Sequence, residues 1–250
     1  MHTYTPDLLL KYNHASTLWE TNDNASLYEY NLQHQPANWY YRNNTVEYAW
    51  NSNGYRCAEW EHIDWARSHV LMGCSYAMGH GVAESDCISS QIDNGVNLAQ
   101  SGTSITAIQY NTIRLLQAGI RPKSVKIIVP NIARLTYWGL DAWLDLTPHD
   151  LSARGEYLVP HVRNCYTGWL ALDPNAEQHG YMTALSVQAL WTSAGVACDL
   201  YQHWAPENPC FNLGTQLPSQ IDLARDVNLN GFAHPGRQTL KLWSDVIYGQ

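Results

Sequence analysis

A serine on a glycine-containing turn and a distant histidine are the residues of this chain that could do chemistry together. Ser75 lies in the segment Gly73-Cys74-Ser75-Tyr76, directly after the apolar run Val70–Met72, and His234 precedes the pair Pro235-Gly236 near the other end. A serine on a sharp turn between a strand and a helix exposes its hydroxyl, and a histidine that folds back onto it removes the proton. The pairing predicts a serine hydrolase.

The turn itself favours the same chemistry. Gly73 allows a strand and a helix to approach closely, and Ser75 at the start of that helix lies where unpaired backbone amides favour a developing anion. Two related motifs do not match. The α/β-hydrolase elbow G-x-S-x-G requires a glycine where Ala77 stands, and the segment Gly79-His80-Gly81 lacks the third glycine of a dinucleotide-binding loop.

The hydrophobic pattern predicts the elements that must position these residues. Short apolar runs bounded by Gly, Pro, Asn or Asp predict strands at 70–72, 96–99, 125–129 and 196–200. Amphipathic stretches predict helices at 104–118 and 181–194, and a last helix that Pro235-Gly236 opens. This alternation is typical of a parallel sheet covered by helices on both faces, so the fold class that we expect is α/β.

Two segments fall outside this alternation. Residues 1–50 are rich in Asn and aromatic residues and show no sustained period, so we expect an N-terminal extension that wraps a catalytic domain formed by residues 51–250. Residues 136–180 also lack a clear period. We expect them to make a long excursion near the ends of the strands, where long loops are often functional.

The composition limits the classes of partner. Only 14% of the residues are charged and the formal net charge is -8, which argues against a nucleic-acid partner. The chain has no run of about 18 apolar residues, and its N-terminus lacks the basic and apolar regions of a signal peptide. We therefore expect a soluble protein without a membrane partner that is not exported by a standard signal.

The aromatic and cysteine contents are also informative. Eleven Trp and sixteen Tyr against two Phe suit either stacking on sugars in a wet cleft or half-buried aromatic rings with satisfied polar tips. The six cysteines are scattered without C-x-x-C spacing, so we expect thiols. His149, Asp150 and His161 match no metal-site spacing, and we expect no bound metal.

The order of the candidate blocks resembles the SGNH hydrolases, also called the GDSL esterase/lipase family. In that family the nucleophile follows the first strand in a G-D-S-L or G-x-S-[FY] block, and residues 73–81 are similar to the variant of microbial and viral members that has Cys in place of Asp. The upstream segment Asn51–Arg56 resembles the N-x-x-G-[FY]-R lead-in of that group. The resemblance spans about residues 46–248 and implies that Ser75 is the nucleophile, with its own N–H in the oxyanion hole.

Two further blocks imply the other oxyanion donors. Residues 97–104 are similar to the second block of the family, in which Gly102 would donate its backbone N–H. The third block, usually G-x-N-D, is degraded to the segment 130–134. There Asn131 would supply a side-chain amide, and Arg134 would substitute for it or clamp the substrate. Tyr76 and His80, near the nucleophile, are further expected substrate-binding residues, with a structural role as the alternative for His80.

The last block of the family is D-x-x-H, and its spacing is broken here. Gly231 stands three residues before His234, so we interpret residues 227–233 as containing an insertion. Asp226 is then the expected carboxylate that orients the histidine. Asp222, a backbone carbonyl that holds the imidazole, and a Ser–His dyad are the alternatives.

The resemblance implies a three-layer α/β/α sandwich, with the site at the carboxyl ends of the strands and an acyl-enzyme mechanism that needs no cofactor. Few cations, many aromatic residues and the frequent work of the resembled family on acetylated sugars favour short acyl esters, chiefly acetyl esters of carbohydrate, as substrates. The main alternative is a non-catalytic carbohydrate-binding or virion-associated module, because two blocks depart from the family pattern. Acyl transfer to a sugar is the third hypothesis. A cytoplasmic or virion-associated location fits all three.

Overall fold

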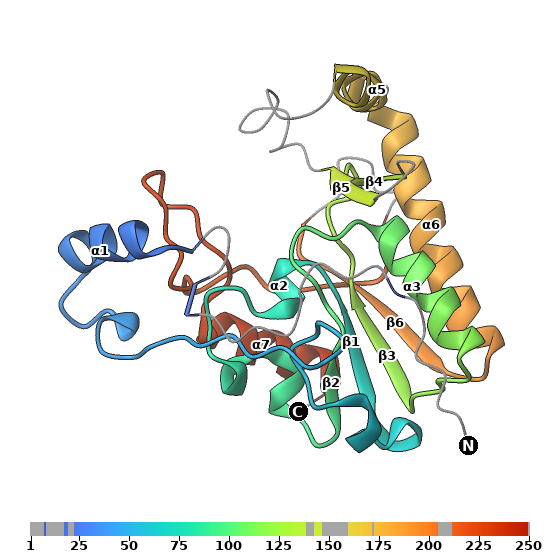
Figure 1. Cartoon of the computed structure of the whole chain (residues 1–250), viewed down its shortest axis with the longest axis horizontal. Coiled ribbons are helices and arrows are strands. Elements are labelled where there is room, and N and C mark those ends of the chain that lie inside the picture. Colours follow the sequence, from blue (N-terminus) through green and yellow to red (C-terminus); the bar gives the residue numbers. More distant parts are fainter. Residues whose placement is uncertain are drawn as a thin grey trace.

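A five-stranded parallel sheet forms the centre of the computed structural model, which describes residues 8, 18–19, 23–138, 143–146, 160–171, 173–204 and 212–249. The strands lie in the order β2-β1-β3-β6-β7 (Figure 1). Their bounds are β1 His69–Gly73, β2 Gly95–Asn97, β3 Ser124–Ile128, β6 Ala197–Gln202 and β7 Thr215–Gln216. Counted along the sheet's own strands, this is the 2-1-3-4-5 order of doubly wound folds, which bind ligands where the order reverses, beside β1 and β3.

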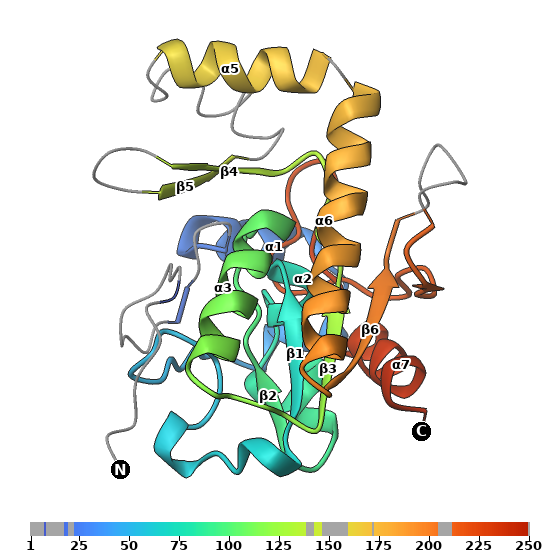
Figure 2. The ribbon, with the colours of Figure 1, turned by 90° about the vertical axis from the view of Figure 1, so that its right-hand side faces the viewer.

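Helices cover both faces of this sheet. Helices α3 and α6 lie side by side on one face, and α7 lies on the other together with the short α2 (Figure 1 and Figure 2). The helices are α1 Ala25–His34, α2 Ser75–Met78, α3 Ile105–Gln117, α5 Pro160–Ala171, α6 Asp173–Ser193 and α7 Arg237–Tyr248. Short 3₁₀ turns lie at Tyr40–Arg42, Trp60–His62, Trp65–Arg67, Glu84–Asp86 and Ile88–Gln91.

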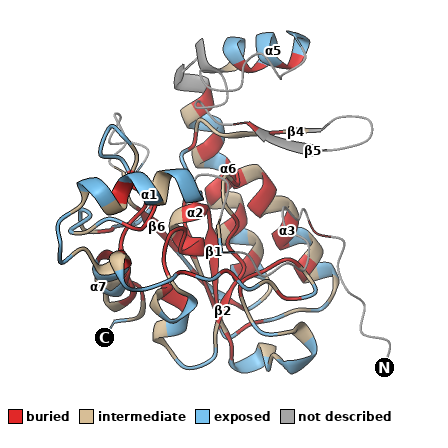
Figure 3. Ribbon diagram, turned by 60° about the vertical axis from the view of Figure 1, so that its left-hand side comes forward, coloured by how far each residue is buried: buried red, intermediate tan, exposed pale blue. Residues whose placement is uncertain are grey.

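Two buried clusters lie between the layers, one on each face of the sheet, because alternate residues of a strand point to opposite faces. Val70 and Met72 of β1 belong to the cluster that includes Trp191 of α6. Leu71, which lies between them, belongs to the cluster that includes Trp243 of α7. Figure 3 shows the central strands as mostly buried. The predicted three-layer α/β/α arrangement with a parallel sheet is confirmed.

The predicted strands and the first predicted helix lie close to the observed ones. Helix α3 begins after Ser104, whose Oγ accepts a hydrogen bond from the backbone N–H of Ala107 at 3.1 Å, as an N-cap residue does. Strand β2 ends two residues before the predicted boundary at residue 99. There the side chain of Asn97 accepts a hydrogen bond from the backbone N–H of Ala99, which turns the chain out of the sheet.

The described residues of 136–180 make the expected excursion beyond the sheet, but they form strands and helices there rather than a long loop (Figure 2). The chain first forms an antiparallel hairpin of β4 Leu135–Trp138 and β5 Trp143–Leu146, then α5, and α6 begins at Asp173 rather than at Tyr181. Figure 2 shows the hairpin and α5 beyond the sheet, beside the upper turns of α6. A small separate core lies there, formed by Leu146, Val162 and Tyr166. Helix α6 packs on the main core through Ala184, Val187 and Trp191.

The described part of the first 50 residues packs against the rest of the molecule. Tyr41, Val46 and Tyr48 are buried in the same cluster as Trp243 of α7. In Figure 1, α1 lies beside the orange-red connection that precedes α7. No helix within the described ranges is long and apolar enough to cross a membrane.

Candidate active site

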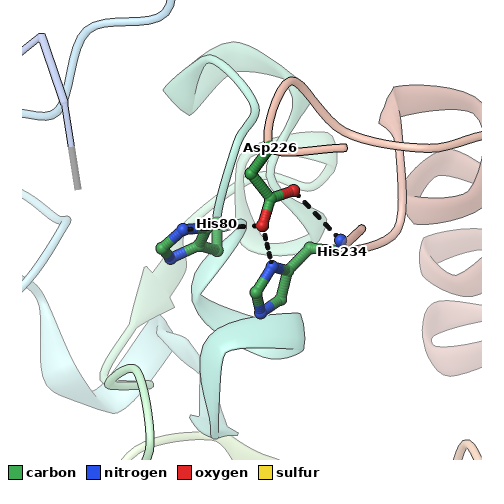
Figure 4. A group of neighbouring side chains, drawn as sticks. All are labelled: His80, Asp226 and His234. Atoms are coloured by element: carbon green, nitrogen blue, oxygen red, sulfur yellow. Dashed lines mark hydrogen bonds and ion pairs between the residues drawn. The ribbon is translucent and has the colours of Figure 1, made fainter. Parts of the chain in front are cut away.

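The hydroxyl of Ser75 and the imidazole of His234 meet, although the two residues are 159 positions apart. The Oγ atom of Ser75 lies 2.9 Å from Nε2 of His234. On the other side of the ring, Nδ1 of His234 lies 2.6 Å from Oδ2 of Asp226 (Figure 4). In such a set the histidine takes the serine proton while the carboxylate holds the imidazole in place. The structure therefore brings together the three residues expected to be catalytic.

Asp226 holds His234 with both of its carboxylate oxygens. Besides the contact to the ring, Oδ1 accepts a hydrogen bond from the backbone N–H of His234 at 3.1 Å. Burial disfavours the ionised carboxylate, but the hydrogen bonds and the charge of His234 outweigh this effect and hold the pKa of Asp226 below its usual value. An ionised Asp226 accepts a hydrogen bond from Nδ1–H, which leaves Nε2 free to accept the serine proton.

Asp222, the alternative carboxylate, has another role. Its side chain accepts hydrogen bonds from the backbone N–H groups of Gln238 at 3.1 Å and Thr239 at 2.8 Å. These are free N–H groups of the first turn of α7, so Asp222 caps that helix. Asp226 is thus the carboxylate that orients His234.

The connection between Asp226 and His234 is closed at its base. The backbone N–H of Ala224 donates to the carbonyl of His234 at 2.8 Å, and Leu223 pairs with Pro235 in an isolated antiparallel bridge. The acid and the base lie on the two arms of this closed loop, eight positions apart. The insertion inferred from the sequence forms the tip of the loop. Asp226 and His234 therefore come into contact although they lack the D-x-x-H spacing.

Gly73 and the first residue of α2 position the nucleophile. Gly73 has a φ of 153°, and a Cβ atom there would lie 2.7 Å from Cβ of Ala77 and 2.8 Å from the carbonyl oxygen of Ile128. Only glycine permits this close approach of strand and helix, as the sequence predicts. Ser75 is the first residue of α2, so its N–H has no acceptor within the helix and remains available to an oxyanion.

A buried arginine fixes the other end of this short helix. Arg56 is 2% exposed, and its guanidinium donates to the carbonyls of Gly79 at 2.7 Å and Val82 at 3.2 Å. Upstream, Oδ1 of Asn51 accepts a hydrogen bond from the backbone N–H of Tyr55 at 2.9 Å and shapes the turn that leads to Arg56. The lead-in segment recognised in the sequence therefore supports the nucleophile turn.

The expected oxyanion donors follow the strands on either side of Ser75. Gly102 lies in the turn after β2, at a φ of 69°, and Gln100 of that turn donates its N–H to the carbonyl of Gly73 at 3.1 Å. Asn131 follows β3, and its Oδ1 accepts a backbone N–H at 2.9 Å, which leaves the Nδ2 amide for another acceptor. Among the described residues, no hydrogen bond joins either of them to Ser75, so their role stays a prediction.

Aromatic and basic side chains surround the reacting pair. The ring of Tyr76 meets that of His234 edge to face at a centroid distance of 5.3 Å. His203, which sequence reasoning missed, follows β6. The centroid of its ring lies 4.4 Å from that of Tyr76. Burial lowers the pKa of His203 to about 4, and the charges of Arg134 and His234 act in the same direction. Arg134 and Tyr76 therefore lie near the site, while substrate binding by them stays a prediction.

His80 is buried beside the reacting pair. Its side chain has no exposed surface, and its Nε2 lies 3.8 Å from Oδ2 of Asp226. The ring lies 4.3 Å from that of His234, centroid to centroid (Figure 4). Burial lowers the pKa of His80 to about 3, so the imidazole is neutral at pH 7. This burial favours the alternative structural role of His80, and a contact of His80 with substrate stays a prediction.

The same three side chains offer ligand atoms to a metal ion. Atoms of His80, Asp226 and His234 lie within 4.8 Å of one another. The separation of 2.6 Å between Asp226 and His234 is that of a hydrogen bond, whereas two ligands of one tetrahedral zinc ion lie about 3.3 Å apart. The observed arrangement therefore fits a proton-transfer pair better than a metal centre.

The structure describes some of the other histidines and cysteines considered in the sequence. His149, Asp150 and Cys210 lie outside the described residues. His161 is exposed on α5, with its Nε2 3.4 Å from the hydroxyl of Tyr137. The described cysteines are free thiols, at Cys57, Cys74, Cys87, Cys165 and Cys198.

Sequence reasoning also missed the residues that brace Asp226. Arg225 is 2% exposed, and its guanidinium pairs with the buried carboxylate of Asp23 and donates to the carbonyl of Val46 at 3.1 Å. Asn31 of α1 donates its Nδ2 amide to the carbonyl of Val227 at 2.8 Å. These contacts join residues about 200 positions apart, and no local pattern could indicate them.

The comparisons with known proteins add no support to this geometry. No protein-family model and no curated protein matches the chain.

Proposed function

We propose that this chain is a serine ester hydrolase of the SGNH type, which removes small acyl groups, chiefly acetyl, from carbohydrate. The observation that carries the proposal is the continuous set Ser75, His234 and Asp226, joined at 2.9 Å and 2.6 Å. Ser75 follows the carboxyl end of β1, beside the reversal of strand order where doubly wound sheets bind ligands. The similarity of residues 73–81 to the nucleophile block of that family supports the same assignment.

The mechanism follows from the order of these groups. Oγ of Ser75 attacks the ester carbonyl carbon while its proton passes to Nε2 of His234, and Asp226 stabilises the resulting imidazolium. When the tetrahedral intermediate collapses, the C–O bond to the alcohol breaks and His234 protonates the leaving oxygen. A water molecule then attacks the acyl-enzyme, again with His234 as the base, and releases the carboxylic acid and free Ser75.

The N–H of Ser75 would donate to the oxyanion of the tetrahedral intermediate, and we assign the same role to the N–H of Gly102 and the amide of Asn131. Donors placed at an oxyanion in this way each accelerate acyl transfer by roughly 10²–10³-fold. All three residues follow neighbouring strands at the carboxyl edge of the sheet.

Restricted access to the nucleophile supports a small acyl group. Ser75 is 4% exposed and His234 is 5% exposed, so a bulky acyl chain would have to displace neighbouring side chains to reach the hydroxyl. Tyr76 and His203 place flat rings with polar atoms beside the pair, which suits a carbohydrate substrate.

Labelling and turnover test the proposal together. We expect the wild type to react with a fluorophosphonate probe and to hydrolyse 4-nitrophenyl acetate. Ser75→Ala should lose the label and lower kcat by about 10⁶-fold. Asp226→Asn should lower kcat by about 10⁴-fold, because the amide favours the wrong tautomer of His234.

The matched control is Ser193→Ala, which removes a hydroxyl that donates to a carbonyl of its own helix, that of Leu190. This variant should keep wild-type labelling and turnover. Circular dichroism of each variant establishes that the fold is retained. A wild type that neither labels nor hydrolyses any acetyl ester, or a Ser75→Ala variant with full activity, would exclude the hydrolase and favour a non-catalytic carbohydrate-binding module.

A further inference from the structure

The tip of the loop between Asp226 and His234 is a built structure. The backbone N–H of Asn228 donates to the carbonyl of Phe232 at 2.8 Å, and the side chain of Asn228 accepts the N–H groups of Asn230 at 2.9 Å and Phe232 at 3.0 Å. These bonds close a tight turn. The tip therefore holds its side chains in fixed positions relative to His234.

This turn presents large apolar side chains to solvent. Leu229 is 73% exposed and Phe232 is 56% exposed, and Ile221 on the same connection is 63% exposed. Single exposed apolar residues are common on proteins, but several on one connection beside a reactive group indicate a contact surface. The ring of Phe232 meets that of His234 edge to face, at a centroid distance of 6.2 Å.

The position of Phe232 beside His234 indicates which half of the ester it meets. In acyl transfer the histidine returns its proton to the leaving alcohol, so that alcohol lies against the histidine. The expected oxyanion donors Gly102 and Asn131 follow β2 and β3 instead, and His234 comes from the separate connection that precedes α7. A group held beside the histidine ring therefore contacts the alcohol rather than the carbonyl oxygen.

We propose that Phe232, with Leu229, forms the subsite for the leaving alcohol and selects alcohols that present a ring with an apolar face. This inference rests on the proposed function and adds the chemical class of the leaving group. Phe232 has no polar side-chain atom, so it recognises a face by stacking rather than a hydroxyl by hydrogen bonding. A pyranose ring and an aryl ring both offer such a face, and the experiment separates them.

The test compares acetyl esters of three alcohols: ethanol, phenol and methyl β-xylopyranoside. Phe232→Ala should lower kcat/KM for a ring ester by about three- to tenfold, the loss of one aromatic stacking contact. Ethyl acetate should change less than twofold. A loss confined to the xyloside ester identifies a sugar, and one confined to phenyl acetate identifies an aryl group. Equal effects on all three esters overturn the proposal.

Two controls sharpen this result. Met182→Ala removes an apolar side chain of similar exposure, 57%, from α6 and should leave all three values unchanged. The ratio of 4-nitrophenyl acetate to 4-nitrophenyl butyrate hydrolysis should be the same in Phe232→Ala and wild type, because the acyl group lies elsewhere. A changed acyl preference without a changed alcohol preference overturns the assignment to the leaving group.

Binding of the free alcohols separates a failure of this subsite from a failure of the proposed function. Methyl β-xylopyranoside and 4-methylphenol are titrated into wild type, Phe232→Ala and Met182→Ala and followed by NMR. If wild type binds one of them, Phe232→Ala does not and Met182→Ala does, the subsite stands even in a protein without esterase activity. If wild type binds neither, or Phe232→Ala binds as wild type does, the subsite is excluded even in an active esterase.

Discussion

His80 lies against the reacting pair as a neutral buried base. In the described part of the chain, neither of its imidazole nitrogens has a hydrogen-bond partner, and its ring lies 4.3 Å from that of His234. Buried polar groups without partners usually destabilise a fold, so these two nitrogens do not stabilise the protein through hydrogen bonds. The contribution that remains to the ring is to fill space behind Asp226. The neutrality of His80 would avoid a second positive charge beside the imidazolium of the proposed mechanism.

The pH dependence of stability should report this burial. Burial lowers the pKa of His80 from 6.5 to about 3, so below pH 6.5 the unfolded chain binds a proton that the folded protein excludes. The free energy of unfolding therefore falls by about 1.4 kcal/mol per pH unit on acidification between these values. His80→Leu removes this term and should gain about 2 kcal/mol relative to wild type between pH 7 and pH 5.

Urea unfolding of both proteins at pH 7 and pH 5 measures this difference directly. Other titrating groups, such as Asp23 and His203, are present in both proteins, so the comparison isolates His80. A parallel pH dependence in the two proteins would show that His80 is protonated in the folded state.

The residues proposed to be catalytic could be predicted at this scale, but not their surroundings. Ser75 and His234 stand beside glycine and Pro-Gly turns that mark them, and Asp226 is the nearest carboxylate before the histidine. The position of the His80 ring beside that of His234 depends on burial, which a single sequence does not display. For the same reason, the sequence left both a substrate contact and a structural role open for His80.

At the scale of elements, the close approach of β1 and α2 determines where the hydroxyl lies. Gly73→Ala would place a Cβ atom 2.7 Å from Ala77 and 2.8 Å from the carbonyl oxygen of Ile128, so the helix must move away from the strand. Such overpacking destabilises a protein by about 1–3 kcal/mol. A displacement of about 1 Å at Ser75 should also lower kcat by about 10²-fold.

Gly119→Ala is the matched control for that change. Gly119 has a φ of 78°, and a Cβ atom there would meet nothing within 4 Å. The control should lower the free energy of unfolding by roughly 1 kcal/mol through backbone strain and leave kcat unchanged. Thermal unfolding and 4-nitrophenyl acetate turnover measure both effects, and equal kcat values in the two variants would contradict the role given to Gly73.

The central elements could be predicted because each has a strong local signal. The strands of the sheet are short apolar runs between turn residues, and α3 has a serine cap and one apolar face. The hairpin of β4 and β5, with α5, packs on a small core of its own, which only a few apolar residues form. No fixed period results, so residues 136–180 could not be assigned.

At the scale of the whole molecule, the N-terminal segment supports Asp226, the proposed acid, through Asp23. The carboxylate of Asp23 is fully buried against the guanidinium of Arg225, the residue before Asp226. Asp23→Ala leaves the buried Arg225 without its counter-charge, which should destabilise the protein by about 3–5 kcal/mol. Replacing both residues, in Asp23→Ala/Arg225→Met, should cost less than the sum of the single changes.

Thermal unfolding should show a fall in Tm of roughly 10 °C for Asp23→Ala. The matched comparison is Asp199→Ala, which breaks the exposed pair of Asp199 with Lys126 and should change stability by less than about 1 kcal/mol. Equal small effects in the two variants would show that the first 50 residues do not brace the site. Asp23 and its partner Arg225 are 202 positions apart in the sequence. No local pattern displays such a contact, so the sequence predicted a separate N-terminal extension.

The bridge between Leu223 and Pro235 has a further consequence for how such a protein can diversify. It lies beneath the acid and the base, together with the bond from the N–H of Ala224 to the carbonyl of His234. We expect that residues 227–233, which lie beyond this bridge, can be lengthened, shortened or exchanged while the contact between Asp226 and His234 is retained. Under the proposed function, transplanting these few residues would change the range of substrates and leave the proton-transfer groups unaltered.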